Sequence, residues 1–469
     1  MKYISFLFFG IIALSACKNN LTDSKTADKT VVINGKVENA TIKVLTITPP
    51  FGAESFNVDI EENDAFTTSF KLAEAGYVQF NLGREFGDFY AKPGDTIGIS
   101  LDAEAFDESL QFTGSSQAEN NYLAKKVLFE QELSKSPKEL FTQPYEVFVE
   151  TLSESKSKML AFIGENKAGL NPEFLIQQKK FAEWDFLLEN SNYESFSAYF
   201  NDGNSLETPT EYANLLNNLD LNDNDLLQYG GFNPIMDKAL QNRGSKIEPG
   251  LTAAQYFQEM IKRAGTLKNT NIKEVVTYTQ IENLINFGGG LDGITTEIDD
   301  YKAYAQNENY LTKLDALVEK WSPLKKGMPA PTFVAKYIDD RDFASEDLKG
   351  KNIYVDVWAT WCGPCKREIP FLKEVEHDYE DQNIEFVSVS IDEESSTSIW
   401  KDFVAAEELG GTQVHAKKAW QSDLVKAYMI EGIPRFLLID AEGKIVSANA
   451  PRPSDADLRP MLDALLAEK

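Results

Sequence analysis

Two cysteines in the last quarter of the chain have the spacing of a redox pair. Cys362 and Cys365 enclose Gly363 and Pro364, and they come shortly after an apolar run that reads as a strand, Ile353–Trp358. This order places the pair at the first turn of a helix, where unpaired backbone N–H groups and the positive end of the helix dipole stabilise a thiolate. Three residues make most of a helical turn, so both sulfur atoms come within bonding distance. The spacing therefore predicts thiol–disulfide exchange.

The two sulfur atoms are expected to have different tasks. Cys362 should be the exposed nucleophile, and Cys365 should be the more buried thiol that resolves the intermediate. Pro364 fits the first helical turn, where its missing N–H group is not needed.

Three other uses of the pair compete with catalysis. A zinc site needs two more ligands, and the sequence, with three cysteines and two histidines, has no second cysteine pair and no His-x-x-His. A covalent haem site needs a histidine directly after Cys365, but Lys366 stands there. An inert disulfide stays open, although a structural brace is more effective when it closes a longer loop. A catalytic dithiol is the preferred interpretation.

Alternating strand and helix patterns surround the pair from residue 332 to the C-terminus. The expected strands are Phe333–Tyr337, Asn352–Trp358, Ile384–Ile391, Thr412–His415, Arg435–Asp440 and Lys444–Ala448. The expected helices are Gly363–Tyr379, Ser395–Glu408, Leu424–Met429 and Ser454–Ala467, the last capped by Ser454 and Asp457. The last two strands form a hairpin, and the whole pattern predicts a three-layer α/β/α domain, residues 332–469.

Two further domains are expected before this one. Residues 31–114 alternate between apolar and polar with period two and predict a small antiparallel β-sandwich. Residues 115–321 change to a helical period and predict an all-α domain, with helix starts at Asn171-Pro172-Glu173 and at Thr252. A segment rich in proline and glycine, residues 322–331, is the predicted linker. The chain is thus expected to be multidomain.

The N-terminus has the pattern of a bacterial lipoprotein. A short apolar run follows Lys2 and ends in Leu14-Ser15-Ala16-Cys17, which resembles a lipobox. The resemblance implies a signal peptide over residues 1–17, cleavage before Cys17 and lipidation of its sulfur. The polar residues 18–30 are then a tether. A plain signal peptide with an incidental cysteine, or a buried N-terminal helix, stays open.

The net charge of −28 is spread along the chain rather than gathered in blocks. This distribution argues against binding to nucleic acids or to anionic lipids through a general electrostatic field. Hydrophobic residues make up 42% of the sequence, which is ordinary for a globular protein.

Several motifs together resemble the thioredoxin superfamily, in its membrane-anchored, extracytoplasmic branch of TlpA- and ResA-like reductases. They are Gly327–Phe333, Gly350-Lys351, Trp358–Cys365, Glu368-Ile369-Pro370 and Gly432-Ile433-Pro434. The resemblance covers the chain from about residue 327 onward. Residues 31–114 resemble, in Pro93–Thr96 and the segments after it, a domain of undefined function that precedes thioredoxin domains in many bacterial lipoproteins.

The resemblance implies a proton carrier for Cys365. Asp356 matches the buried acid that shuttles a proton to or from the resolving cysteine, and burial would raise its pKa towards neutrality. An acid paired only for structural reasons is the alternative. Ser388 stands about where cytoplasmic thioredoxins place a basic residue, which leaves the proton path to water. Arg435 replaces the usual threonine, and the glutamate of dedicated cytochrome-maturation reductases has no match, so cytochrome assembly as the sole role is not favoured.

The resemblance also implies substrate contacts around the pair. Pro434 matches the cis-proline beside the disulfide, and Ile433 would present its backbone to the substrate. A trans proline in a turn is the alternative. Trp361, Gly363 and Pro364 are also expected to contact the substrate.

The predicted function is that of an extracytoplasmic protein thiol–disulfide oxidoreductase, most simply a reductase, lipid-anchored and facing the periplasm of a Gram-negative bacterium. Its predicted partners are client proteins with disulfides and a thiol-type electron donor in the membrane; no cofactor, metal or nucleic acid is expected. A thiol peroxidase would need a Pro-x-x-x-Thr-x-x-Cys setting that these cysteines lack. A client- or glycan-binding lipoprotein, served by an accessory thioredoxin domain, is the second alternative.

Overall fold

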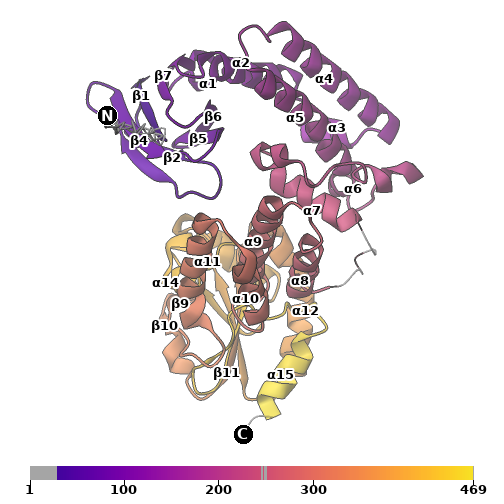
Figure 1. Cartoon of the computed structure of the whole chain (residues 1–469). Coiled ribbons are helices and arrows are strands. Elements are labelled where there is room, and N and C mark those ends of the chain that lie inside the picture. Colours follow the sequence, from indigo (N-terminus) through magenta and orange to yellow (C-terminus); the bar gives the residue numbers. More distant parts are fainter. Residues whose placement is uncertain (1–28, 244–246, 248–250, 468–469) are drawn as a thin grey trace, which may run out of the picture. The chain divides into compact units, whose positions relative to one another are not determined.

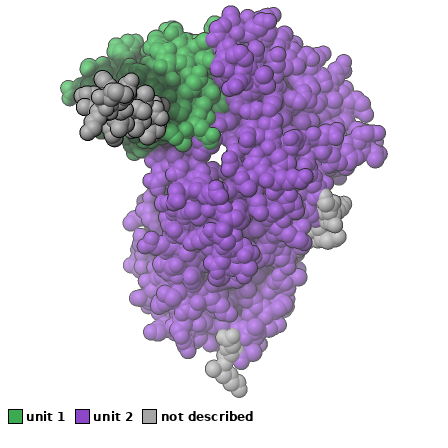
Figure 2. Space-filling view, viewed as in Figure 1, with its two compact units in different colours: residues 1–47, 56–128 green, residues 48–55, 129–469 purple. Residues whose placement is uncertain are grey.

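The computed structural model describes residues 29–243, 247 and 251–467 (Figure 1). The predicted signal peptide, the lipidation site Cys17 and nearly all of the predicted tether lie outside these residues. The chain divides into two compact units (Figure 2). One comprises residues up to 47 together with 56–128, and the other comprises residues 48–55 and 129–469.

The first unit contains two four-stranded sheets. Their strand orders are β4-β1-β7-β8 and β3-β2-β5-β6. The strands are β1 (Thr30–Glu38), β2 (Val44–Thr48), β3 (Phe56–Asp59), β4 (Ala65–Lys71), β5 (Gly76–Leu82), β6 (Glu85–Ala91), β7 (Thr96–Asp102) and β8 (Gln111–Gly114), with a short helix α1 (Phe106–Ser109) between the last two. The predicted alternation is confirmed, since the apolar positions of both sheets are buried and form one hydrophobic cluster.

The prediction of a purely antiparallel arrangement is wrong at one pair of strands. β1 runs antiparallel to β4 but parallel to β7, with Ile33 opposite Ile97 and Val37 opposite Leu101. A parallel neighbour needs a long connection between the two strands. The intervening strands provide that connection, which is a long-range arrangement that period-two alternation does not report.

Helices predominate among the described residues between 117 and 321. They are α2 (Gln117–Leu133), α3 (Pro137–Phe141), α4 (Tyr145–Glu165), α5 (Pro172–Ser191), α6 (Tyr193–Phe200), α7 (Phe232–Asn242), α8 (Ala253–Ala264), α9 (Thr270–Phe287), α10 (Thr295–Tyr304) and α11 (Glu308–Trp321), with 3-10 turns at Thr210–Asn214, Asn224–Gln228 and Ser322–Leu324. Both predicted helix starts are confirmed. The Asn171 side chain accepts from the Glu173 N–H group, and Thr252 forms a capping box with Gln255. Within the described residues, no helix combines the length and the apolar composition that crossing a bilayer requires.

A seven-stranded sheet occupies the C-terminal part of the second unit, in the order β10-β9-β13-β12-β11-β14-β15. The strands are β9 (Val334–Tyr337), β10 (Asp342–Ala344), β11 (Asn352–Trp358), β12 (Ile384–Ser390), β13 (Thr412–His415), β14 (Arg435–Ile439) and β15 (Ile445–Ser447). The helices are α12 (Gly363–Asp378), α13 (Thr397–Ala406), α14 (Asp423–Ala427) and α15 (Leu458–Ala467), with 3-10 turns at Ser345–Leu348, Glu394–Ser396 and Ala419–Gln421. β11 lies inside the sheet, parallel to β12 and antiparallel to β14.

Alternate residues of β11 point to opposite sides of the sheet and belong to two different buried clusters. Tyr354 belongs to a buried cluster with α12 and α15. Val355 and Val357 belong to another cluster that includes residues of α13 and α14. Helices α9, α10 and α11 contribute to this second cluster as well, so these helices and the sheet share one core.

The predicted start of the last helix at Ser454 is wrong, whereas Asp457, the other predicted capping residue, directly precedes the helix. α15 begins at Leu458, and the Ser454 hydroxyl donates to the Glu368 carboxylate at 3.0 Å instead of capping a helix. The Ser454 N–H group donates to the same carboxylate at 3.0 Å. Ser454 therefore joins the segment before α15 to α12, a contact between elements far apart in sequence.

Candidate active site

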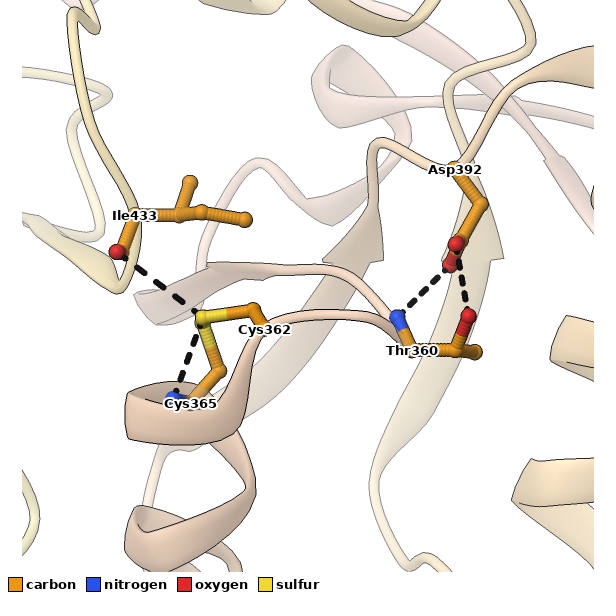
Figure 3. The surroundings of a disulfide bond; sticks show 5 residues. All are labelled: Thr360, Cys362, Cys365, Asp392 and Ile433. Atoms are coloured by element: carbon orange, nitrogen blue, oxygen red, sulfur yellow. Dashed lines mark hydrogen bonds between the residues drawn. A yellow bond between two sulfur atoms is a disulfide. The ribbon is translucent and has the colours of Figure 1, made fainter. Parts of the chain in front are cut away.

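Cys362 and Cys365 form a disulfide at the N-terminus of α12, directly after β11 (Figure 3). Cys362 is the N-cap residue of this helix, and its Sγ atom accepts the Cys365 backbone N–H group at 3.1 Å. Gly363 and Pro364 are the first two helical residues, so Pro364 lies in the first turn as predicted. The sulfur of Cys362 thus sits where backbone donors and the helix dipole favour negative charge.

The predicted difference in exposure between the two cysteines is wrong for the disulfide form. Each cysteine is only 4% exposed. The Cys362 Sγ atom lies 3.8 Å from the Ile433 carbonyl oxygen, so the loop that carries Ile433 covers it (Figure 3). The neighbouring Trp361 is 58% exposed and presents an aromatic surface beside the disulfide. Sequence spacing places the two sulfur atoms but does not report the loop that packs over them.

The peptide bond between Ile433 and Pro434 is cis, which is the geometry that the resemblance implies. The next residue, Arg435, turns inward and is 3% exposed. Its Nη2 atom donates to the Asn286 carbonyl oxygen at the end of α9, at 2.8 Å. Burial lowers the pKa of Arg435 to about 10, against the attraction of Glu431. Arg435 therefore ties the loop beside the disulfide to the helical segment.

Asp392, which the sequence analysis did not single out, holds the segment before the disulfide. Its carboxylate accepts the Thr360 N–H group at 3.0 Å and the Thr360 hydroxyl at 2.7 Å (Figure 3). The Ser390 hydroxyl donates to the same carboxylate at 2.8 Å, and Asp392 is fully buried. A signal for it exists in the sequence, since Asp392 follows a parallel strand at its carboxyl end, where functional residues of α/β sheets collect.

Asp356 lies on β11 and lines a small cavity together with Cys365. Burial, together with the nearby negative charges of Glu376 and Glu368, raises the pKa of Asp356 to about 8. The predicted direction of this pKa change is confirmed, whereas the role of Asp356 in catalysis stays a prediction. Ser388 lies directly opposite Asp356 in the neighbouring strand β12. This is the position at which the sequence analysis expected a basic residue in cytoplasmic thioredoxins.

The cavity has a volume of about 10 Å³, which is roughly the room that one water needs. It lies between α12, β11, β12 and the segment that leads into β13. Its lining residues are Asp356, Trp358, Cys365, Ile369, Leu372, Lys373, Glu376, Ser388, Leu409, Gly410 and Gln413. The sequence analysis did not single out Glu376 or Gln413, because both come from elements that only the fold brings to the cysteines.

Metal binding has no support in the described part of the chain, where no three His, Cys, Asp or Glu side chains are arranged to hold an ion. His377 lies on the exposed side of α12, and its side chain is 79% exposed. The geometry instead offers a dithiol–disulfide pair, a backbone carbonyl beside one sulfur and an acid of raised pKa behind the other. This combination supports exchange chemistry with a proton acceptor close to the resolving thiol.

Comparison with known proteins gives a consistent answer. Residues 325–465 match the family described as Redoxin. The thiol-disulfide oxidoreductase ResA of Bacillus thuringiensis subsp. konkukian is 28% identical over 127 residues, which are 27% of this chain and 70% of that protein. ResA of Bacillus subtilis is 29% identical over 123 residues, 26% of this chain and 66% of that protein.

Solved structures also resemble this part of the chain. The thioredoxin domain of a thiol-disulfide oxidoreductase from Bacteroides vulgatus is 28% identical, with a TM-score of 0.28, over 30% of this chain and 99% of that one. A thiol:disulfide interchange protein from a Bacteroides species is 28% identical, with a TM-score of 0.28, over 31% of this chain and 94% of that one. Together with the family match and the ResA relatives, the dithiol site shows that the chain is a thiol-disulfide oxidoreductase with a C-terminal domain of the thioredoxin superfamily, in its TlpA/ResA-like branch.

Proposed function

We propose that this protein reduces disulfide bonds in extracytoplasmic proteins through its own Cys362–Cys365 pair. The observation that carries the proposal is the position of the pair, between a helix N-terminus, a cis-proline loop and an acid of raised pKa. The helix N-terminus stabilises the Cys362 thiolate, the loop offers backbone to a client, and the acid can take the Cys365 proton.

The reaction proceeds in two exchange steps. The Cys362 thiolate attacks a client disulfide, forms a mixed disulfide and releases one client sulfur as a thiolate. Cys365 then gives its proton to Asp356, and its sulfur attacks Cys362, which releases the second client sulfur. The client gains two electrons and two protons, and the Cys362–Cys365 disulfide forms. A donor dithiol outside this chain has to reduce the pair again.

A cleft beside the disulfide is the place for the client chain. It has a volume of about 1170 Å³, above the range usual for small-molecule pockets. One wall comes from the start of α8 and the loop after α9, and the other from Gly432–Phe436, β15 and α15. Ile433 belongs to the lining, and its carbonyl oxygen lies 3.8 Å from the Cys362 Sγ atom, so this residue borders both the cleft and the reacting sulfur. This cleft supports a polypeptide client over a small disulfide.

The remaining predictions on architecture stay part of this proposal. The single cluster of buried residues from both sheets supports a β-sandwich for residues 31–114. Clusters on both faces of the seven-stranded sheet support a three-layer thioredoxin-like domain for residues 332–469, after a helical domain at 115–321 and a linker at 322–331.

We also keep the proposal of a lipid anchor at Cys17 and of a periplasm-facing location. Its support is the lipobox-like sequence alone. Mass spectrometry of the membrane fraction tests it: acyl mass on Cys17 supports the anchor, whereas an unmodified chain in the soluble fraction contradicts it.

The experiment for the exchange chemistry compares two serine variants with the wild type. Cys362→Ser should abolish the reduction of insulin and form no mixed disulfide, because it lacks the attacking sulfur. Cys365→Ser should accumulate a mixed disulfide through Cys362, because the resolving sulfur is gone. Intact-mass analysis of both reduced variants after mixing with insulin measures this. A lasting adduct on Cys362→Ser and none on Cys365→Ser would reverse the assignment.

A further inference from the structure

Two residues that line the cavity behind Cys365 each carry a buried polar atom without a partner among the described residues. These atoms belong to the indole N–H group of Trp358 and the side-chain carbonyl oxygen of Gln413. The Gln413 amide nitrogen donates to the Gly410 carbonyl oxygen at 2.7 Å, which fixes the orientation of the amide. Buried polar groups are nearly always hydrogen-bonded, by ordered water where no protein group is available. With about 10 Å³ of space, one donor and one acceptor, the cavity is suited to a single water.

A stripe of α12 lines this cavity from the disulfide to Glu376. Its members are Cys365, Ile369, Leu372, Lys373 and Glu376. Eleven residues of helix rise about 16 Å, and helical side chains tilt towards the N-terminus, which brings the Glu376 carboxyl back along the stripe. Asp356 faces the same stripe from β11. The cavity thus leads from the resolving cysteine past one acid to a second.

Two glycines, Gly410 and Gly411, lie directly against the carboxyl group of Glu376. A Cβ atom on Gly410 would lie 2.6 Å from one carboxyl oxygen of Glu376, and a Cβ atom on Gly411 would lie 2.8 Å from the other. Both glycines are exposed, and Glu376 is half-buried. The Glu376 carboxyl therefore lies at the boundary, with the cavity on one side and a solvent-exposed glycine turn on the other.

The charges around the two acids suit proton transfer between them. Burial raises the pKa of Glu376 to about 7, with Lys373 opposing the rise, and the pKa of Asp356 is about 8. Groups with similar pKa values exchange a proton at little cost in free energy. Lys373 and Glu368 are the other charged groups of α12 near these acids, while β12 and β13 contribute only the neutral Ser388 and Gln413 to the lining. Lys373 donates to the Glu407 carbonyl oxygen at the end of α13.

We propose that Glu376 is the outer station of a proton path that runs from Cys365 through Asp356 and a buried water to the solvent. The proposal rests on the exchange function proposed above and acts through Asp356, so Glu376 is a positioning and relay residue. In the release step Asp356 takes the Cys365 proton, the Cys365 sulfur attacks Cys362, and the client thiolate leaves. The proton on Asp356 then passes through the water to Glu376 and into the solvent, where the client thiolate takes up a proton. The path restores the Asp356 carboxylate for the next turnover.

The test compares Glu376→Gln with Glu374→Gln, a matched control on an exposed position of the same helix. The rate of client release from the mixed disulfide is measured between pH 5.5 and 9.5, and the pKa of Asp356 is followed by NMR of its carboxyl carbon. Glu376→Gln should slow release about tenfold near pH 7, a smaller effect than the loss of a direct proton acceptor. Its rate should approach the wild-type rate above pH 9, and the pKa of Asp356 should fall because a like charge is removed. Glu374→Gln should match the wild type.

The outcomes separate this proposal from the proposed function. A Glu376→Gln variant with the wild-type pH profile, in a protein that reduces insulin normally, would overturn the relay and leave the exchange chemistry intact. A wild type that forms no mixed disulfide would overturn the exchange chemistry itself. If Glu376→Gln does not fold, the test uses Glu376→Asp, which keeps a carboxyl group but shortens the side chain by one methylene. Slower release in this variant supports the relay. An unchanged pH profile contradicts the relay.

Discussion

The two sides of the disulfide differ in nearly every physical property. On the client side, Cys362 adjoins the exposed Trp361 and the Ile433 carbonyl oxygen, and Ile433 also lines a cleft of about 1170 Å³. On the proton side, Asp356 and a cavity of about 10 Å³ adjoin Cys365. A client chain needs an open surface of varied chemistry, whereas an acid of raised pKa needs to be removed from water. One pair of sulfur atoms can meet both needs because the helix start presents them to opposite environments.

The helical segment contributes to only one of these sides. Arg435 donates to the Asn286 carbonyl oxygen, and the Asn449 side chain donates to the Phe287 carbonyl oxygen at 2.6 Å. Both contacts attach the end of α9 to the loop and strands that border the cleft. None of the residues that line the small cavity comes from the helical segment. The helices therefore border the proposed client cleft, whereas the lining of the small cavity comes from the thioredoxin-like domain.

Replacing the acid on the proton side should give the largest effect among the following changes. Asp356→Asn should slow release of the client at pH 7 about a hundredfold, because the Cys365 thiol loses its proton acceptor. The difference should shrink as the pH rises and the thiol ionises without help. Stopped-flow measurement of release between pH 6 and 9 checks this, and the attack of Cys362 on a small disulfide, which does not use Asp356, is the control. A release rate equal to that of the wild type at every pH would make Asp356 a structural residue.

Filling the cleft should give a smaller effect that depends on the substrate. Ala253 is exposed at the start of α8 and lines the cleft, so Ala253→Trp should obstruct a polypeptide without disturbing a core. We expect kcat/KM for insulin to fall about tenfold, a loss of about 1.4 kcal/mol in transition-state binding, while the reaction with a small aromatic disulfide is unchanged. Ala406→Trp, at an exposed position of α13 away from the cleft, is the matched control. An equal loss with both substrates would argue against a client cleft.

A separate effect is expected on the pH dependence of stability rather than on a rate. The pKa of Asp356 is raised from 3.8 to about 8 in the folded protein, so the folded state binds more protons than the unfolded state between these values. The free energy of unfolding is therefore greatest at the low-pH end of this window. As the pH rises towards 8, Asp356 lowers the free energy of unfolding by up to about 1.4 kcal/mol per pH unit. Asp356→Asn should flatten this dependence. Urea unfolding of the disulfide form at pH 5 to 9 checks it, and a steeper fall in the variant would contradict the cause given for the pKa.

Much of the client side and of the framework could be predicted from the sequence. The apolar run before the cysteines gives β11 with its observed bounds, and Pro364 marks the first turn of α12. The Ile433–Pro434 bond is cis, as the resemblance implies. These features depend on local chemistry: apolar runs, helix starts and turn residues are set by neighbours in the sequence.

Contacts between distant segments escaped prediction. β10 has only three residues, too few for a period to show, and it is defined by its pairing with β9. The Ser454 contact with Glu368, the equal burial of both cysteines and the cavity partners Glu376 and Gln413 all depend on packing. An acid on a helix reads as a solvated residue in the sequence, and only the glycine turn against it reveals its environment.

The direction of electron flow is the central claim, and the redox midpoint potential of the Cys362–Cys365 pair tests it most directly. The residues between the sulfur atoms are Gly363 and Pro364, and no histidine lies there to stabilise a thiolate further. A moderately stabilised thiolate makes a reducing couple, so the midpoint should lie on the thioredoxin side of about −200 mV, with thioredoxin itself near about −270 mV. Equilibration with dithiothreitol or glutathione buffers, followed by the fluorescence of Trp358 and Trp361, gives the value. A midpoint potential of about −120 mV, as in strongly oxidising proteins, would make this protein a disulfide donor and contradict the account.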